Sequence, residues 1–242
     1  MRMVVDLLEQ LLAATVLLIA SAFDLLNREV PDWVWIPGLV GGAVLRILDP
    51  GRTLSYLEVA WPIIIVLVIM LLAEWLLSAS GEADLLAYLT LALISTEPYL
   101  YLPPSFLVYL LSKLLLVMVL PFQFVINLAR VSRRPELLRE FDEPLHRRVL
   151  ALFLLSPYSK HLAVGARIAE VREDGRRRFI LRAALAPLER SEIREEGEGM
   201  WIAPTYPFIP FILAAYVIVQ LLCLWLPLAP PSPPPLACRS SP

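Results

Sequence analysis

The chain has 242 residues, of which 58% are hydrophobic and only 18% are charged, and its mean hydropathy is +0.68. Soluble domains carry about 25% charged residues, so the composition excludes an ordinary soluble domain for much of the chain and indicates a membrane protein. The formal net charge is −2, and the two cysteines, Cys223 and Cys238, form no CxxC pair. The sequence therefore predicts neither a structural zinc site nor a disulfide framework.

Apolar segments predict six membrane crossings. A spanning helix needs about 20 largely apolar residues, and four segments meet this length: 7–23, 59–77, 106–128 and 208–228. Residues 33–47 form a shorter segment whose glycines favour close helix packing, and residues 85–95 need to continue to about residue 102. A secretion signal is the alternative for the first segment. We expect a retained span instead, because Asp6 and Glu9 stand where a signal would be basic.

A long polar insert separates the fifth and sixth segments, at 129–200. It holds 15 of the 21 Lys and Arg residues and 12 of the 23 acids, a near balance that argues against a nucleic-acid partner. Apolar periodicity predicts a helix over 140–155, and a turn between 166–171 and 178–185 predicts a β-hairpin. We expect a small α+β domain or a sheet lying at the membrane surface.

The chain thus divides into residues 1–128 with five spans, the insert at 129–200, the sixth span at 201–228 and a Pro-rich tail at 229–242. Counting the crossings places Arg28 and the arginines that follow the fifth span on the side of the insert. Basic residues near span ends favour the cytoplasm. The fold class expected is therefore a multi-pass, all-α cell-membrane protein with six transmembrane helices and a small cytoplasmic α+β insert between helices 5 and 6.

Two aspartates are expected at the cytoplasmic edge of the membrane: Asp24 directly follows the first span, and Asp84 opens the fourth. Two carboxyl groups brought together can share one proton, so that one acts as a base on water and the other as an acid on a scissile carbonyl oxygen. Such chemistry needs no metal and no cofactor. An aspartate at a helix end is otherwise an ordinary cap, favourable at an N-terminus and unfavourable at a C-terminus.

Three segments resemble one family. Residues 80–89, Ser-Gly-Glu-Ala-Asp-Leu-Leu-Ala-Tyr-Leu, are similar to the GxGD motif of intramembrane aspartic peptidases, with Ala83 at the third motif position. Residues 24–35 place Arg28 four residues after Asp24 and continue with Val-Pro, at Pro31, and an aromatic pair. Residues 201–208 resemble the entry to the last span. The pattern is similar to that of archaeal type IV prepilin-like, or preflagellin (prearchaellin), peptidases.

The resemblance implies an aspartic endopeptidase that removes class III signal peptides from pilin and archaellin precursors at the cytoplasmic membrane face. It implies Asp24 and Asp84 as the catalytic pair, and it places five further residues on the active-site loops: Arg28, Pro31, Gly81, Glu82 and Ala83. No metal or cofactor is implied, and cleavage without methylation is expected. The expected partners are precursors with basic leader peptides and the lipid bilayer. Three acids on the same loops are candidates for contacts with the leader, or are ordinary solvated loop charges: Glu29, Asp32 and Glu82.

Two alternatives belong to other functional classes. One is a polytopic transporter-like protein with acids along a polar path, and the other is a non-catalytic membrane scaffold that presents the insert to a partner. The transporter would need ionisable residues inside several spans, where Lys113 is the main candidate. We expect Lys113 to pair with Glu58 or to extend toward the headgroups, and we assign Glu74 no role.

Overall fold

The computed structural model describes residues 2–76, 81–95, 102–158, 166–173, 176–181 and 200–225. The described chain is mostly helical with a small sheet region. The predicted tail at 229–242, the tip of the predicted hairpin and residues 182–199 of the insert lie outside the described residues.

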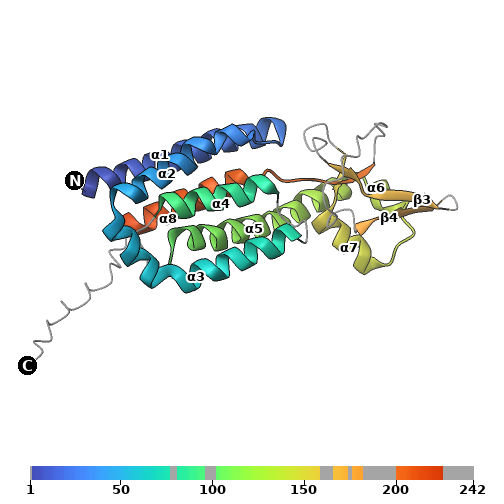
Figure 1. The fold of residues 1–242 in the computed structure, drawn as a ribbon. Coiled ribbons are helices and arrows are strands. Elements are labelled where there is room, and N and C mark those ends of the chain that lie inside the picture. The colour runs from blue at the N-terminus through green and yellow to red at the C-terminus, as the bar shows by residue number, and fades with distance from the viewer. Residues whose placement is uncertain are drawn as a thin grey trace, which may run out of the picture.

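Six helices form an elongated bundle (Figure 1). They are α1 (Arg2–Asn27), α2 (Ile36–Leu48), α3 (Pro50–Leu76), α4 (Glu82–Ile94), α5 (Pro104–Arg133) and α8 (Ile209–Trp225). A 3-10 helix, η1 (Asp32–Val34), connects α1 to α2. The insert lies at one end of the bundle, and the N-terminus lies at the other (Figure 1). The six predicted apolar segments thus each correspond to one helix of the bundle, but α4 ends at Ile94, with Ser95 as its C-cap, instead of continuing to about residue 102.

Two stretches, Val4–Asn27 and Pro104–Arg133, are long and apolar enough to cross a membrane. Only 33% and 22% of their most apolar windows are buried inside the protein. Apolar surface of this extent, turned away from the protein core, is typical of contact with lipid or a partner. Two shorter apolar helices, Ala60–Glu74 and Ile209–Cys223, accompany them. Length and composition of these helices are therefore weakly consistent with a membrane protein.

Glycines allow α2 to pack closely against α4, as the Gly-rich segment predicts. Gly38 and Gly42 are one helical turn apart and both are buried. A Cβ atom on Gly38 would meet Thr90 Cγ2 at 2.4 Å, and one on Gly42 would meet the Cβ and carbonyl carbon of Leu93 at 3.1 and 3.2 Å. Small residues at both positions are what allow the two backbones to approach.

Replacing Gly42 with valine is expected to lower the free energy of unfolding by about 1–3 kcal/mol, the usual cost of overpacking a core. The neighbouring Leu93 carbonyl carbon is backbone and cannot swing aside. Gly51→Ala is the matched control, because its nearest neighbour would be Asp49 Oδ1 at 4.0 Å. Thermal unfolding in detergent measures both. Equal melting temperatures for the two variants would contradict the close approach.

The insert is a small α+β unit, as predicted. It contains α6 (Glu136–Arg139), α7 (Leu145–Leu154), β1 (Ser156–Pro157), β2 (Arg167–Ile168), β3 (Glu170–Glu173), β4 (Arg176–Phe179) and β5 (Trp201–Ala203). The antiparallel pair β3–β4, with Glu170 opposite Phe179, confirms that a hairpin forms here. Its strands span 170–173 and 176–179 rather than the predicted 166–171 and 178–185, because residues 167–168 form β2 in another sheet. The predicted helix begins at Leu145 rather than at residue 140, because Pro144 disfavours a helical conformation for the residue before it.

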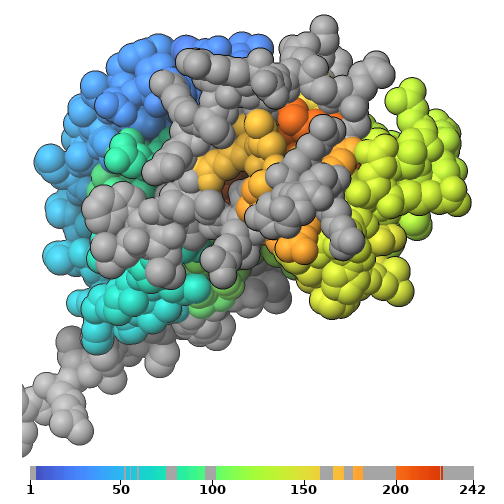
Figure 2. All heavy atoms as spheres, turned by 90° about the vertical axis from the view of Figure 1, so that its right-hand side faces the viewer, coloured from blue at the N-terminus to red at the C-terminus, as the bar shows by residue number. Residues whose placement is uncertain are grey.

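A second sheet has the order β1-β5-β2, so β5 is its central strand, antiparallel to both neighbours. Residues 201–203 therefore belong to the fold of the insert, whereas the sequence places them with the last span. In the end view of the molecule, strands of the insert occupy the middle, between α1–α3 on one side and α6 and α7 on the other (Figure 2).

The core of the insert is aromatic. The rings of Phe141 and Phe179 stack with centroids 3.9 Å apart, and Trp201 meets both edge-on. The Arg177 guanidinium lies 4.7 Å above the centre of the Phe141 ring and bonds to Glu170 at 2.6 Å and to Glu140 at 2.5 Å. Burial opposes its charge, but these hydrogen bonds and charges prevail and raise the pKa of Arg177.

Side-chain amides on α5 fasten the insert to the bundle. Asn127 is fully buried, and its Nδ2 donates to the carbonyl oxygens of Leu152 at 2.8 Å and Leu155 at 2.6 Å. Gln123 Nε2 donates to the Leu155 oxygen at 3.3 Å. These carbonyls belong to the last turn and C-cap of α7, where no further turn of helix can satisfy them. The bonds therefore hold α7 on the end of α5.

Candidate active site

Asp24 lies in the last turn of α1 and is partly buried. An acid there opposes the dipole of its own helix. The structure explains its presence, because Oδ2 accepts a hydrogen bond of 2.9 Å from the backbone amide of Ile209, the first residue of α8. The carboxyl group of Asp24 therefore satisfies an otherwise unpaired amide at the N-terminus of another helix.

Asp84 lies in the first turn of α4 and is also partly buried. Its Oδ2 accepts a hydrogen bond of 3.0 Å from the backbone amide of Gly81, the residue that precedes the helix. This is the return half of a capping box, in which the third helical residue bonds back to the cap. Asp84 is thus favourably placed in the dipole of α4.

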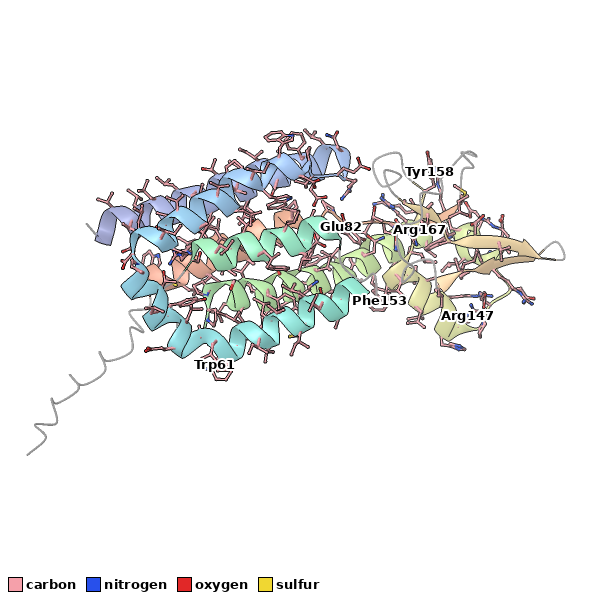
Figure 3. All side chains as sticks on the ribbon, viewed as in Figure 1. Trp61, Glu82, Arg147, Phe153, Tyr158 and Arg167 are labelled. Carbon is pink, nitrogen blue, oxygen red and sulfur yellow. The ribbon has the colours of Figure 1, made fainter. Side chains whose placement is uncertain are left out.

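The two carboxyl groups lie on two of three helices, α1, α4 and α8, that contact one another. The end of α1 packs near the starts of α4 and α8, and each pair of these helices is in contact. Asp24 lies close enough to Asp84 to act on it electrostatically. Figure 3 shows Glu82, two residues before Asp84, at the end of α4 that faces the insert. The two predicted catalytic residues therefore lie at the same end of the bundle, next to the insert (Figure 1).

Arg28 directly follows the last residue of α1 and has a left-handed backbone conformation, with φ of 58°. This conformation is uncommon for residues other than glycine, and here it reverses the chain toward Pro31, η1 and α2. Its guanidinium interacts electrostatically with Asp24. Burial lowers the pKa of Arg28, and the Asp24 carboxylate opposes that effect. Among the described residues, no hydrogen-bond partner meets its buried Nε and Nη1.

The remaining predicted loop residues flank Asp84. Gly81 has φ −78° and ψ 161°, an extended conformation that any residue adopts. The backbone freedom of glycine is therefore not used at this position. Ala83 is partly buried, and Glu82 is exposed.

A polar cluster lies beside the two aspartates. Glu74 on α3 accepts hydrogen bonds from Tyr109 Oη at 2.6 Å and from Lys113 Nζ at 2.8 Å, both on α5. Tyr88 Oη and Ser112 Oγ form a buried hydrogen bond of 2.7 Å next to them. Glu74 and Lys113 both act electrostatically on Asp84. This cluster belongs to the surroundings of the candidate site.

The ion pair of Lys113 with Glu74 corrects the expected pairing with Glu58. Side-chain direction along a helix depends on its rotation, which the sequence of one span does not reveal. A signal was nevertheless present: Glu74 and Lys113 are single charges within otherwise apolar segments. Charges in such segments are usually paired with one another.

The described residues contain no group of three or more His, Cys, Asp and Glu side chains that could hold a metal ion. Comparisons of the chain with models of protein families, with curated proteins and with solved structures found no match. The function is therefore argued from the site itself.

Proposed function

We propose that the chain is a membrane aspartic endopeptidase with six transmembrane helices, whose insert and catalytic end face the cytoplasm. The observation that supports the proposal is that Asp24 and Asp84, on different helices, lie at the same end of the bundle (Figure 1), each bonded to a backbone amide at a helix start. Acids inside apolar helices are costly unless they have a role or a partner.

The reaction uses one proton shared by the two carboxyl groups. The ionised carboxylate takes a proton from water, and the water oxygen attacks the peptide carbonyl carbon while the protonated carboxyl group donates its proton to the carbonyl oxygen. Collapse of the tetrahedral intermediate breaks the C–N bond: the carboxyl group that took the proton from water gives it to the leaving nitrogen, and a hydroxyl of the intermediate returns a proton to the other carboxylate. The pair titrates as a unit, so neither residue has a fixed protonation state.

The proposed substrates are pilin-like and archaellin precursors with a basic leader followed by an apolar helix. Support comes from the likeness of segments 24–35, 80–89 and 201–208 to the preflagellin peptidase pattern. Location also supports it, since an apolar substrate helix in the bilayer brings its leader to the membrane edge. The test is to mix membranes that carry the protein with such a precursor and to measure the product mass. Cleavage at the leader–helix junction supports the proposal, and an intact precursor across several substrates refutes it.

Reversing two exposed acids near the site, with Glu29→Lys and Glu82→Lys together, is expected to weaken binding of a basic leader. Exposed charge pairs contribute about 0.2–1 kcal/mol each, so the loss of two should raise KM about 2- to 30-fold while kcat stays the same. With a precursor whose leader lysines are replaced by glutamates, the double variant should show no rise in KM. Glu136→Lys, an exposed acid on α6, serves as the control. The same KM change with both leaders would argue against these contacts.

A further inference from the structure

The ion pair of Lys113 with Glu74 touches both halves of the candidate site. Lys113 Nζ lies 2.8 Å from Glu74 Oε2 and 4.4 Å above the centre of the Phe208 ring. Phe208 immediately precedes Ile209, whose amide holds Asp24. Lys113 also acts electrostatically on Asp84. One side chain of α5 is thus linked to the anchor of one aspartate and to the charge of the other.

We propose that Lys113 is a positioning residue for the aspartate pair: anchored by Glu74, its ammonium holds the start of α8, and through it Asp24, in place relative to Asp84. The inference rests on the proposed peptidase function. The contact of the ammonium with the Phe208 ring is a cation–π interaction, which strengthens where water is excluded. Glu74 is the counterion that offsets the cost of placing a cation among apolar helices.

Removal of the ammonium has two consequences for the site. The Phe208 ring loses its charged neighbour, so the turn that leads into Ile209 is less constrained. Glu74 then loses its cationic partner, although Tyr109 Oη still donates to it, and its negative charge repels that of Asp84. Both changes disturb the geometry of the pair, whereas Lys113 itself takes no part in the proposed proton transfers. We therefore expect the loss to fall on kcat rather than on KM.

A second ion pair in the bundle provides a matched control. Arg46 on α2 bonds to Glu9 on α1, and its Nη2 also donates to the Ile94 carbonyl at 2.7 Å, at the C-terminal end of α4. This pair ties α1, α2 and α4 together at the opposite end of α4 from Asp84. Breaking it removes a comparable partly buried contact without touching Phe208 or the aspartates.

The experiment compares wild type, Lys113→Met, Lys113→Arg and Arg46→Met in cleavage of a purified precursor, with rates expressed per folded protein. For Lys113→Met, kcat is expected to fall about 10- to 100-fold, the scale of an ångström-sized misplacement. KM should change by less than about twofold. Lys113→Arg should stay within about threefold of wild type, because a guanidinium keeps both the ion pair and the ring contact. Arg46→Met should melt at lower temperature with unchanged kcat. Equal kcat losses in Lys113→Met and Arg46→Met, or no rescue by arginine, would overturn the inference.

A distance measurement separates this inference from the proposed function. Spin labels on Thr205→Cys and Glu82→Cys, in a background with both native cysteines replaced by serine, report the separation between the start of α8 and the start of α4. Lys113→Met is expected to shift or broaden this distance distribution, and Arg46→Met is not. If wild type cleaves no precursor, the proposed function fails while the distances still decide on the positioning role. Identical distributions in all variants would then reject it.

Discussion

Asp24→Asn and Asp84→Asn are each expected to abolish precursor cleavage while leaving the fold intact. Loss of one member of a catalytic pair typically lowers kcat by at least about 10³-fold. An asparagine amide can neither take a proton from water nor donate one to a carbonyl oxygen. It still presents an oxygen to the amides of Ile209 and Gly81, which the two aspartates bind. Asparagine caps helices about as well as aspartate does.

The two asparagine variants distinguish a catalytic role from helix capping, which is the simpler explanation for both residues. If Asp24 and Asp84 were caps alone, the asparagine variants would cleave at the rate of wild type, and the alanine variants would lose about 0.5–2 kcal/mol of stability. Asp49→Asn is the matched control, since Asp49 is a partly buried aspartate at the C-terminal end of α2, the end away from η1. The measurement is the initial rate of precursor cleavage at equal amounts of folded protein. Undiminished cleavage by either asparagine variant would remove that residue from the mechanism.

The positions of the helices could be predicted because apolar runs are a local signal. The predicted segment at 208–228 corresponds to α8, which begins at Ile209, and the segment that opens near Asp84 corresponds to α4, which begins at Glu82. The hairpin β3–β4 was also predictable, since its two strands are joined by one short turn. In each case, residues close in sequence carry the information.

Contacts between distant segments were less predictable. Residues 201–203 read as the entry to the last helix, but they form the central strand β5 because β1 and β2, far back in the chain, leave a place between them. The pairing of Lys113 with Glu74 depends on how α3 and α5 are rotated against each other. The same holds for Asp24, whose partner, the Ile209 amide, lies near the other end of the chain. The sequence predicted the two aspartates but not what anchors them.

The start of α8 depends both on local sequence and on contacts between distant segments. The chain runs from β5, in the sheet of the insert, through residues 204–208 directly to Ile209. The insert is in turn fastened to α5 by Asn127. The amide that anchors Asp24 is therefore held from one side by the insert and from the other by the contact of Lys113 with Phe208. This makes the insert part of the support of the proposed active site.

Trp201→Ala is accordingly expected to unfold much of the insert and to lower precursor cleavage. Trp201 is fully buried in β5; its Nε1 donates to the Leu137 carbonyl at 3.0 Å, and its ring packs on Phe141 and Phe179. Replacing a buried tryptophan with alanine costs about 3–5 kcal/mol, a large share of the about 5–15 kcal/mol that stabilises a typical domain. Limited proteolysis should therefore cut the insert much faster than in wild type.

Two controls show whether the effect comes from the core of the insert. Trp201→Phe keeps an aromatic ring but loses the bond to Leu137, so its proteolysis rate should fall between those of wild type and Trp201→Ala. Trp61→Ala removes a tryptophan that is 57% exposed on α3, where Figure 3 shows it pointing away from the bundle. This variant should change neither proteolysis of the insert nor cleavage. If Trp201→Ala loosens the insert but cleaves its precursor at the wild-type rate, the start of α8 is held by the bundle alone, and the insert serves another purpose than supporting Asp24.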